Sequence, residues 1–266
     1  MTTTVVTAQA ISIEEQRENE LQEARAIQLA MLASESLRTE RIDIESEFQP
    51  FSEVGGDFLD YFLLSDGTAG LYLGDVTGKG LPAALFAALA VGTLRGVHKT
   101  GTAPNTVLAQ LNKRMMLKSV TARYAAVQYA HLDPETGILR IASAGMHGPL
   151  HLCARGCVEV NLSGIPPGLF PQAEYEMSEI RLAVGDSVVF LSDGLIDAMN
   201  EKGEILGLER VAEMLTDCRE KDPRETLRTL FSRVEEYSKG QAQQDDRTAA
   251  VLRYLPSSPE ETRSSI

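Results

Sequence analysis

Cysteine and tryptophan are scarce in this sequence. The 266 residues include no tryptophan and three cysteines, Cys153, Cys157 and Cys218. A small, odd number of cysteines does not support a framework of disulfide bonds and is typical of a protein from a reducing compartment. No second cysteine pair and no histidine stands at zinc-finger spacing from Cys153 and Cys157, so we expect reduced cysteines on a surface hairpin and no structural zinc.

Long apolar runs and basic residues are lacking as well. The longest apolar run, near residues 81–91, is shorter than the roughly 18–20 residues that a membrane-spanning helix needs. The N-terminus has no basic segment followed by an apolar core, as a secretory signal would, so we expect a cytoplasmic protein without membrane contacts. Lysine and arginine number 25 against 38 aspartates and glutamates, a net charge of −13, which argues against nucleic acid as a partner.

We expect residues 1–10, which are small and polar, to be disordered, and the following residues up to about 40 to form one long helix. From Ile13 to about Thr39 the chain is rich in Glu, Gln, Arg, Ala and Leu and contains no Gly or Pro, a composition of high helix propensity. Its apolar residues follow an imperfect heptad, so two interpretations stay open: a helix packed on its own domain, or a helix that dimerises or transmits a signal. We divide the chain into an N-terminal linker or dimerisation helix (1–40), a main domain (41–255) and a disordered tail (256–266).

The main domain combines strands with pairs of helices. Period-two alternation over residues 42–48 and apolar runs at 61–64 and 71–73 predict consecutive strands joined by tight turns. A helix is expected over 81–97, apolar nearly all round and therefore buried against a sheet, and a second helix over 103–118. Because the strands come in meanders and not in βαβ units, we expect an α+β fold of antiparallel sheets with helices on their outer faces.

Four acidic segments share one arrangement, in which an aspartate stands at the end of a strand or in a loop that borders one. They contain Asp57, Asp75, Asp193 and the pair Asp245 and Asp246. Each alone is typical of a turn, but together they indicate one site. Carboxylates without histidine or cysteine favour Mg²⁺ or Mn²⁺ over zinc. Two such ions about 3.5–4 Å apart can share a water, lower its pKa toward about 7 and direct it at a phosphorus atom.

Other phosphate chemistry is poorly supported. Gly74–Gly80 superficially resembles a P-loop, but Gly74 stands one residue too close to Gly78 and Lys79 is followed by Gly80, where that motif requires G-x4-G-K-[ST]. Lys79 has two interpretations, as a contact for a phosphate or as a solvated side chain. The chain contains no G-x-S-x-G and no C-x5-R motif, so nothing in it marks a nucleophilic side chain.

The acidic segments lie within longer motifs. These are VGGDFLD at 54–60, GDVTGKGLPAAL at 74–85, LAVGD at 182–186, LSDGLIDAMN at 191–200, GLER at 207–210 and DDRT at 245–248. In content and order they resemble the SpoIIE/RsbU-type branch of the PPM family, the metal-dependent serine/threonine protein phosphatases of bacteria. The resemblance covers about residues 42–254, and Ala24–Gln28 resembles the family's linker helix. It implies a PPM-type α/β sandwich, two packed antiparallel sheets flanked by helices.

The resemblance also implies a site and an activity. The implied ligands of two Mn²⁺ or Mg²⁺ ions are Asp57, Asp75, Val76 through its backbone carbonyl, Asp193 and Asp245. Asp246 is the second choice for the last of these roles. The implied activity is a phosphoserine/phosphothreonine protein phosphatase that acts through metal-activated water on a phosphorylated STAS-type anti-anti-sigma regulator. The alternative is a phosphatase-like module that binds phosphoproteins without turnover.

Three positions depart from the family pattern. The family's AGH becomes Ala144-Gly145-Met146, with His147 one place later, the threonine of TDG is Ser192, and GxPLG becomes Gly164–Gly168. None of these changes removes an implied metal ligand, so we expect activity. The role of the loop that contains Met146 is left open.

Overall fold

The chain folds as two antiparallel β-sheets packed face to face, with helices on both outer faces. The computed structural model describes residues 2–33, 35–99, 101–117 and 123–256. The predicted sandwich is confirmed. The tail that we expected to be disordered lies, from residue 257 onward, outside the described residues.

The sheets have six and five strands. The six-stranded sheet runs in the order β1 (Leu37–Arg38), β2 (Ile42–Gln49), β11 (Arg247–Tyr254), β10 (Ser187–Leu191), β7 (Leu150–Cys153) and β8 (Gly156–Glu159). The five-stranded sheet runs in the order β3 (Phe58–Leu63), β4 (Ala69–Val76), β5 (Ala125–Asp133), β6 (Ile138–Ala144) and β9 (Met177–Arg181). Since β2 and β11 come from opposite ends of the domain and pair directly, the segments around residues 50 and 246 become neighbours.

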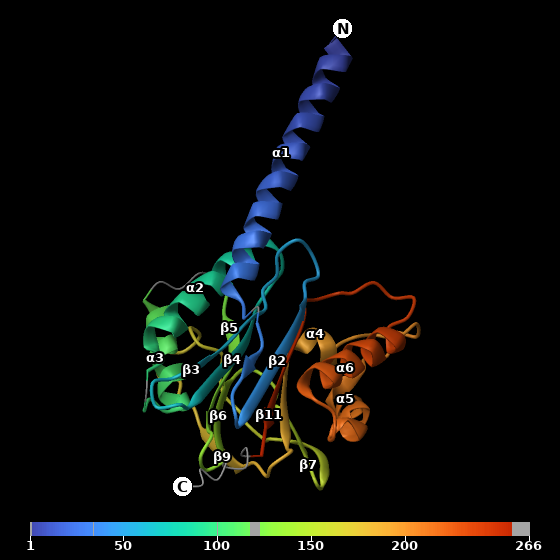
Figure 1. Cartoon of the computed structure of the whole chain (residues 1–266). Coiled ribbons are helices and arrows are strands. Elements are labelled where there is room, and N and C mark those ends of the chain that lie inside the picture. Colours follow the sequence, from blue (N-terminus) through green and yellow to red (C-terminus); the bar gives the residue numbers. More distant parts are fainter. Residues whose placement is uncertain (1, 34, 100, 118–122, 257–266) are drawn as a thin grey trace, which may run out of the picture.

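Helices cover the outer face of each sheet, as Figure 1 shows. The five-stranded sheet is covered by α2 (Leu81–Val97) and α3 (Pro104–Met116). The six-stranded sheet is covered by α4 (Asp193–Ile196), α5 (Gly207–Leu215), a 3₁₀ turn (Thr216–Cys218) and α6 (Pro223–Tyr237). The molecule therefore has four layers, with apolar side chains between each adjacent pair.

Strand β4 illustrates how the sequence makes these layers. Leu71 and Leu73 are fully buried in the core between the two sheets. Tyr72 is equally buried but belongs to the core under α2 and α3. Successive side chains of a strand point to opposite faces of its sheet, so a continuous apolar run is required where both faces are covered. Asp75 continues this strand at its end.

One expectation about α2 was wrong. Its bounds are those predicted, and its inner face is buried, but Leu81, Leu85 and Leu89 are 44%, 65% and 50% exposed. These three residues are spaced by four and so form one stripe along the helix. The apolar composition had suggested burial all round, whereas a helix that packs on one sheet buries only the side that faces it.

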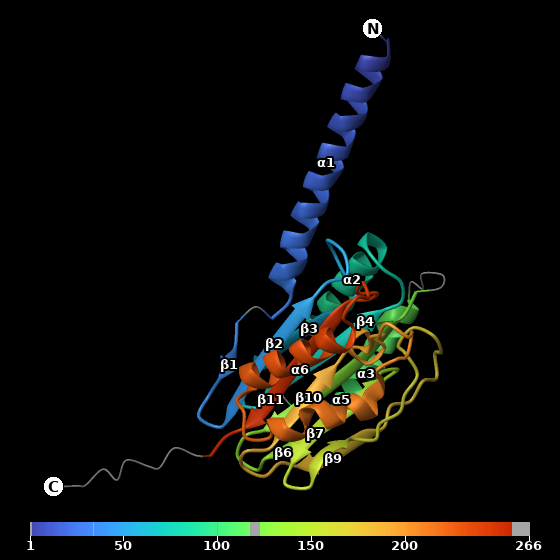
Figure 2. The ribbon, with the colours of Figure 1, turned by 90° about the vertical axis from the view of Figure 1, so that its right-hand side faces the viewer.

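The N-terminal helix α1 (Thr2–Met31) is predicted correctly in kind but not in extent. It begins at Thr2, so the expectation that residues 1–10 are disordered was wrong, and it ends earlier than Thr39, because Leu37–Arg38 form β1 and pair with β2. Figure 2 shows α1 projecting away from the sandwich, and residues 13–20 are all exposed. Among the described residues, no helix is long and apolar enough to cross a membrane.

The last turns of α1 are tied to the domain by Gln28. This side chain is 4% exposed, donates from Nε2 to the carbonyl of Gly55 at 2.7 Å and accepts the Gly55 N–H at Oε1 at 3.0 Å. One side-chain amide therefore satisfies both the backbone N–H and the backbone carbonyl of the buried residue Gly55. Because Gly55 lies two residues before Asp57, the contact links α1 to the loop that carries a predicted ligand.

Replacing Gln28 with alanine is expected to lower the free energy of unfolding by about 2–4 kcal/mol, since each buried backbone group left without a partner costs about 1–3 kcal/mol. Urea denaturation of the whole chain measures this. Gln22→Ala is the matched control, because Gln22 lies on the same helix and is exposed. Equal losses of stability in the two variants would contradict the assigned role of Gln28.

Candidate metal centre

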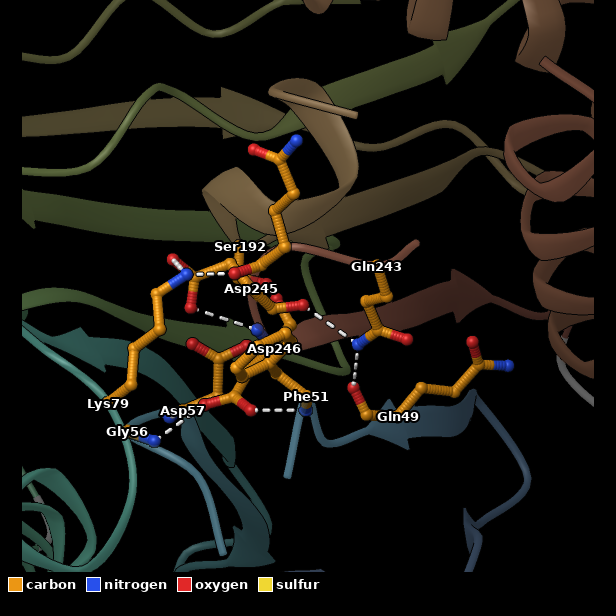
Figure 3. A network of polar contacts seen from close by, with 10 residues as sticks. Gln49, Phe51, Gly56, Asp57, Lys79, Ser192, Gln243, Asp245 and Asp246 are labelled. Carbon is orange, nitrogen blue, oxygen red and sulfur yellow. Dashed lines mark hydrogen bonds and ion pairs between the residues drawn. The ribbon is translucent and has the colours of Figure 1, made fainter. Parts of the chain in front are cut away.

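The five aspartates of the acidic segments come together at one edge of the sandwich. Asp57 precedes β3, Asp75 lies near the end of β4, Asp193 opens α4 directly after β10, and Asp245 and Asp246 precede β11. Strand β3 pairs with β4, and β10 pairs with β11. Each sheet therefore brings two acidic segments side by side, and the packing of the sheets brings the two pairs together. Figure 3 shows Asp57, Asp245 and Asp246 in this cluster.

The carboxylate of Asp246 accepts hydrogen bonds from the backbone. Its Oδ1 accepts the N–H of Phe51 at 2.8 Å, and its Oδ2 accepts the N–H of Gly56 at 2.6 Å and that of Asp57 at 3.4 Å. Asp246 is 4% exposed. Both carboxylate oxygens are thus engaged in holding the segment 51–57 in place (Figure 3).

Asp245 is oriented differently. It is half-buried, and its Oδ1 accepts the N–H of Asp246 at 3.0 Å. Its Oδ2 lies 2.9 Å from Nζ of Lys79. Gln243 holds the backbone at this point, since its Nε2 donates to the carbonyls of Asp245 at 2.8 Å and of Gln49 at 2.9 Å (Figure 3). The carboxylate of Asp245 therefore faces the site, whereas that of Asp246 is taken up by main-chain donors.

Asp57 is the most deeply buried acid of the cluster, with 1% of its surface exposed. Its Oδ2 accepts the hydroxyl proton of Thr248, and Ser192 is a second hydroxyl close to it. Burial raises the pKa of Asp57 well above its usual value, and the negative charges of Asp75 and Asp246 raise it further. Sequence reasoning did not single out Thr248, although its place in the DDRT motif was visible.

Asp75 and Asp193 share this electrostatic condition. Burial is the main cause that raises the pKa of Asp75 to about 7, and the charge of Asp193 is the second. Burial first, and then the charges of Asp245 and Asp197, raise the pKa of Asp193. Within the described residues, no group of three or more Asp, Glu, His or Cys side chains is placed so that it could hold a metal ion as it stands. The carboxylates are nevertheless close enough to disfavour one another's charge, and a bound cation is the general remedy for such repulsion.

The donor atoms fit a hard divalent cation. The five predicted ligands supply carboxylate oxygens and, at Val76, a backbone carbonyl, which are the ligands that Mg²⁺ and Mn²⁺ prefer. The carbonyl of Val76 lies where Gly56 passes: a Cβ added at Gly56 would be 2.8 Å from that oxygen and 3.4 Å from Oδ1 of Asp75. A side chain at position 56 would thus fill the space between the loop of Asp57 and the end of β4.

The loop that replaces the AGH motif borders the same edge. The backbone carbonyl of Met146 accepts the hydroxyl proton of Ser143, and the Met146 side chain packs against the core between the sheets. The carbonyl of His147 accepts from Gln128. The His147 side chain is exposed and close enough to Asp193 to affect its pKa. Met146 therefore contributes to packing, and His147 lies at the rim of the cluster.

Curated relatives match most of this chain. The protein IcfG of Synechocystis is 26% identical over 227 residues, which cover 74% of this chain and 36% of IcfG. The phosphoserine phosphatase RsbU of Bacillus subtilis is 24% identical over 193 residues, which cover 72% of this chain and 57% of RsbU. The chain therefore spans about a third to just over half of the length of these relatives.

Solved structures share the fold. The SiaA-PP2C domain of Pseudomonas aeruginosa superposes with a TM-score of 0.79 at 23% identity, covering 91% of this chain and 98% of that one. The PP2C phosphatase domain of SpoIIE from B. subtilis, solved with a fragment of its regulatory domain, gives 0.71 at 18% identity over 83% and 64% of the two chains. The model of the stage II sporulation protein E (SpoIIE) family matches residues 65–255. Because this match covers most of the chain and includes three of the four acidic segments, the chain belongs to the SpoIIE family and has its PP2C-type fold.

Proposed function

We propose that this chain is a Mg²⁺- or Mn²⁺-dependent phosphatase of phosphoserine or phosphothreonine proteins. The observation that carries the proposal is the gathering of Asp57, Asp75, Asp193 and Asp245 at one edge of the sandwich, where burial and then neighbouring carboxylates raise the pKa values of the first three. RsbU and RsbP of B. subtilis, both named phosphoserine phosphatases, match 72% and 67% of the chain. A structural neighbour, RsbX, is described in complex with magnesium.

The residues divide into ligands and supports. Asp57, Asp75, the Val76 carbonyl, Asp193 and Asp245 would hold two cations. When bound, such cations lower the pKa of water and hold phosphoryl oxygens. Asp246 would orient the backbone before Asp57, and the Thr248 hydroxyl would fix the rotation of the Asp57 carboxylate. Both supports would keep ligand atoms in place without contacting the phosphate.

The substrate we propose is a phosphorylated STAS-type regulator, released by dephosphorylation in a partner switch. RsbU and RsbP among the relatives, and a structural neighbour whose description concerns the bacterial stressosome, support this class. The rival proposal is a module that binds phosphoproteins without turnover. The two differ in one measurable property, which is a metal-dependent rate.

Release of phosphate from a panel of phosphoserine proteins and from p-nitrophenyl phosphate, with Mn²⁺ or Mg²⁺ and with EDTA, tests the activity. We expect turnover with the metals and its loss with the chelator. In Asp75→Asn we expect a decrease of about a hundredfold or more, because metal stabilisation of the transition state amounts to several kcal/mol. Turnover that persists in EDTA would contradict the metal chemistry. Phosphoprotein binding without turnover would favour the rival.

Asparagine substitutions at the two adjacent acids separate ligand from support. Asp246→Asn is expected to lower the free energy of unfolding by about 1–3 kcal/mol, since its new NH₂ group faces a backbone N–H where an oxygen had accepted it. Asp245→Asn is expected to change stability by less than about 1 kcal/mol, because its ion pair is half-exposed, but to abolish metal-dependent turnover. Urea denaturation and the phosphatase assay give the two readouts. Full turnover in Asp245→Asn would remove this residue from the proposed ligands.

We also propose that α1 joins two copies of the chain. Ile13 and Ile27 are 61% and 64% exposed and stand fourteen residues apart in the sequence, which places them on nearly the same side of a helix. Multi-angle light scattering of the whole chain should show a dimer, and Ile27→Glu should shift it toward the monomer. Arg25→Glu is the control for a charge change on the same helix. A wild-type monomer at all concentrations would leave α1 as a helix of its own domain.

A further inference from the structure

The ammonium group of Lys79 is held on three sides. Its Nζ lies 2.9 Å from Oδ2 of Asp245, donates to the backbone carbonyl of Gln244, and stands 4.8 Å from the centre of the Phe51 ring. Figure 3 shows the side chain extending from its own loop, along one side of the cluster, to Asp245. Neither interpretation of Lys79 from the sequence, a phosphate contact or a solvated side chain, anticipated this arrangement.

The backbone around Lys79 supports this placement. Gly78 and Gly80, on either side of it, have φ values of +90° and +68°, which residues with side chains rarely adopt. Thr77 pairs with Tyr124 through its N–H at 3.1 Å and through its hydroxyl, which accepts the Tyr124 N–H at 3.2 Å. The loop is therefore anchored before Lys79, and α2 begins directly after Gly80. The conformation of this loop therefore places the Lys79 side chain against Asp245.

Asp245 is the acid of the cluster with a cationic side chain against it. Within the described residues, no lysine or arginine forms an ion pair with Asp57, Asp75 or Asp193, whereas Asp245 pairs with Lys79. The other oxygen of Asp245 accepts a backbone N–H. A divalent cation that binds Asp245 at Oδ2 therefore has to share this oxygen with the ammonium group or displace it, and a cation at either oxygen is repelled by the positive charge of Lys79.

We propose that Lys79 competes with the divalent cation for Asp245 and thereby lowers the metal affinity of this centre. The proposal rests on the proposed metal-dependent function and adds a residue that sets how tightly the metal is held. The aromatic face of Phe51 and the carbonyl of Gln244 stabilise the ammonium group in the competing position. Lys79 therefore changes the metal affinity of the centre without being one of its ligands.

Isothermal titration of the whole chain with Mn²⁺ tests this without any assay of activity. Lys79→Met removes the charge but keeps much of the length, and the Kd for Mn²⁺ is expected to fall by about fivefold, the upper range for an ion pair whose side chains are 44% and 39% exposed. Lys79→Arg keeps the charge and should remain within about twofold of wild type. Lys113→Met removes a charge from an exposed position on α3 and should leave the Kd unchanged.

An unchanged or higher Kd in Lys79→Met would overturn the proposal. If the Michaelis constant for a phosphopeptide rose at the same time, Lys79 would be assigned to phosphate binding instead. A fall in Kd that is equally large in Lys79→Arg would also contradict competition through charge. Failure of the underlying function looks different, because then neither wild type nor any Lys79 variant binds Mn²⁺, and Asp245→Asn changes nothing.

Discussion

The carboxylate of Asp246 connects the parts of this molecule that make the candidate site. It belongs to the segment before β11 in the six-stranded sheet, and it accepts the N–H groups of Phe51, Gly56 and Asp57. Asp57 leads into β3 of the other sheet. A single buried side chain therefore ties the segment before β11 to the loop that leads into β3, at the place where the packing of the two sheets brings the acids together. Gln28 binds the same loop through two hydrogen bonds to Gly55.

Bringing the acids together also makes their carboxylates repel one another. Burial and neighbouring charges raise the pKa values of Asp57, Asp75 and Asp193, so the fold holds acids where their charges are costly. A fold tolerates such a cost where a cation offsets it, and sites of this kind tend to be functional. Two sources of positive charge could offset this cost here, namely the divalent cations proposed for the site and the ammonium group of Lys79. Their competition for Asp245 would link metal affinity to the position of the loop that starts α2.

Much of the fold could be predicted from local patterns. The bounds of α2, the strands of the meander and the antiparallel class follow from periodicity and turn residues, because those depend on residues close in sequence. The exposure of Leu81, Leu85 and Leu89 could not be predicted, since it depends on how much of α2 the sheet covers. The short helix α4 at Asp193 was also missed, because Asp-Gly is typical of a turn and only burial of Leu195 and Ile196 under the neighbouring elements favours a helical turn there.

The five aspartates that the structure brings together could be singled out in the sequence alone, because carboxylate oxygens are the ligands that a hard cation prefers and the motifs that contain these residues are specific. Which contacts each acid makes was decided by the tertiary structure. Asp245 and Asp246 are adjacent and chemically identical, yet one faces the cluster and the other accepts main-chain N–H groups from a segment nearly two hundred residues away. The contacts of Thr248, Gln28 and Lys79 were likewise decided by the tertiary structure. Their partners lie far along the chain, and only the packing of the two sheets and of α1 brings them within reach.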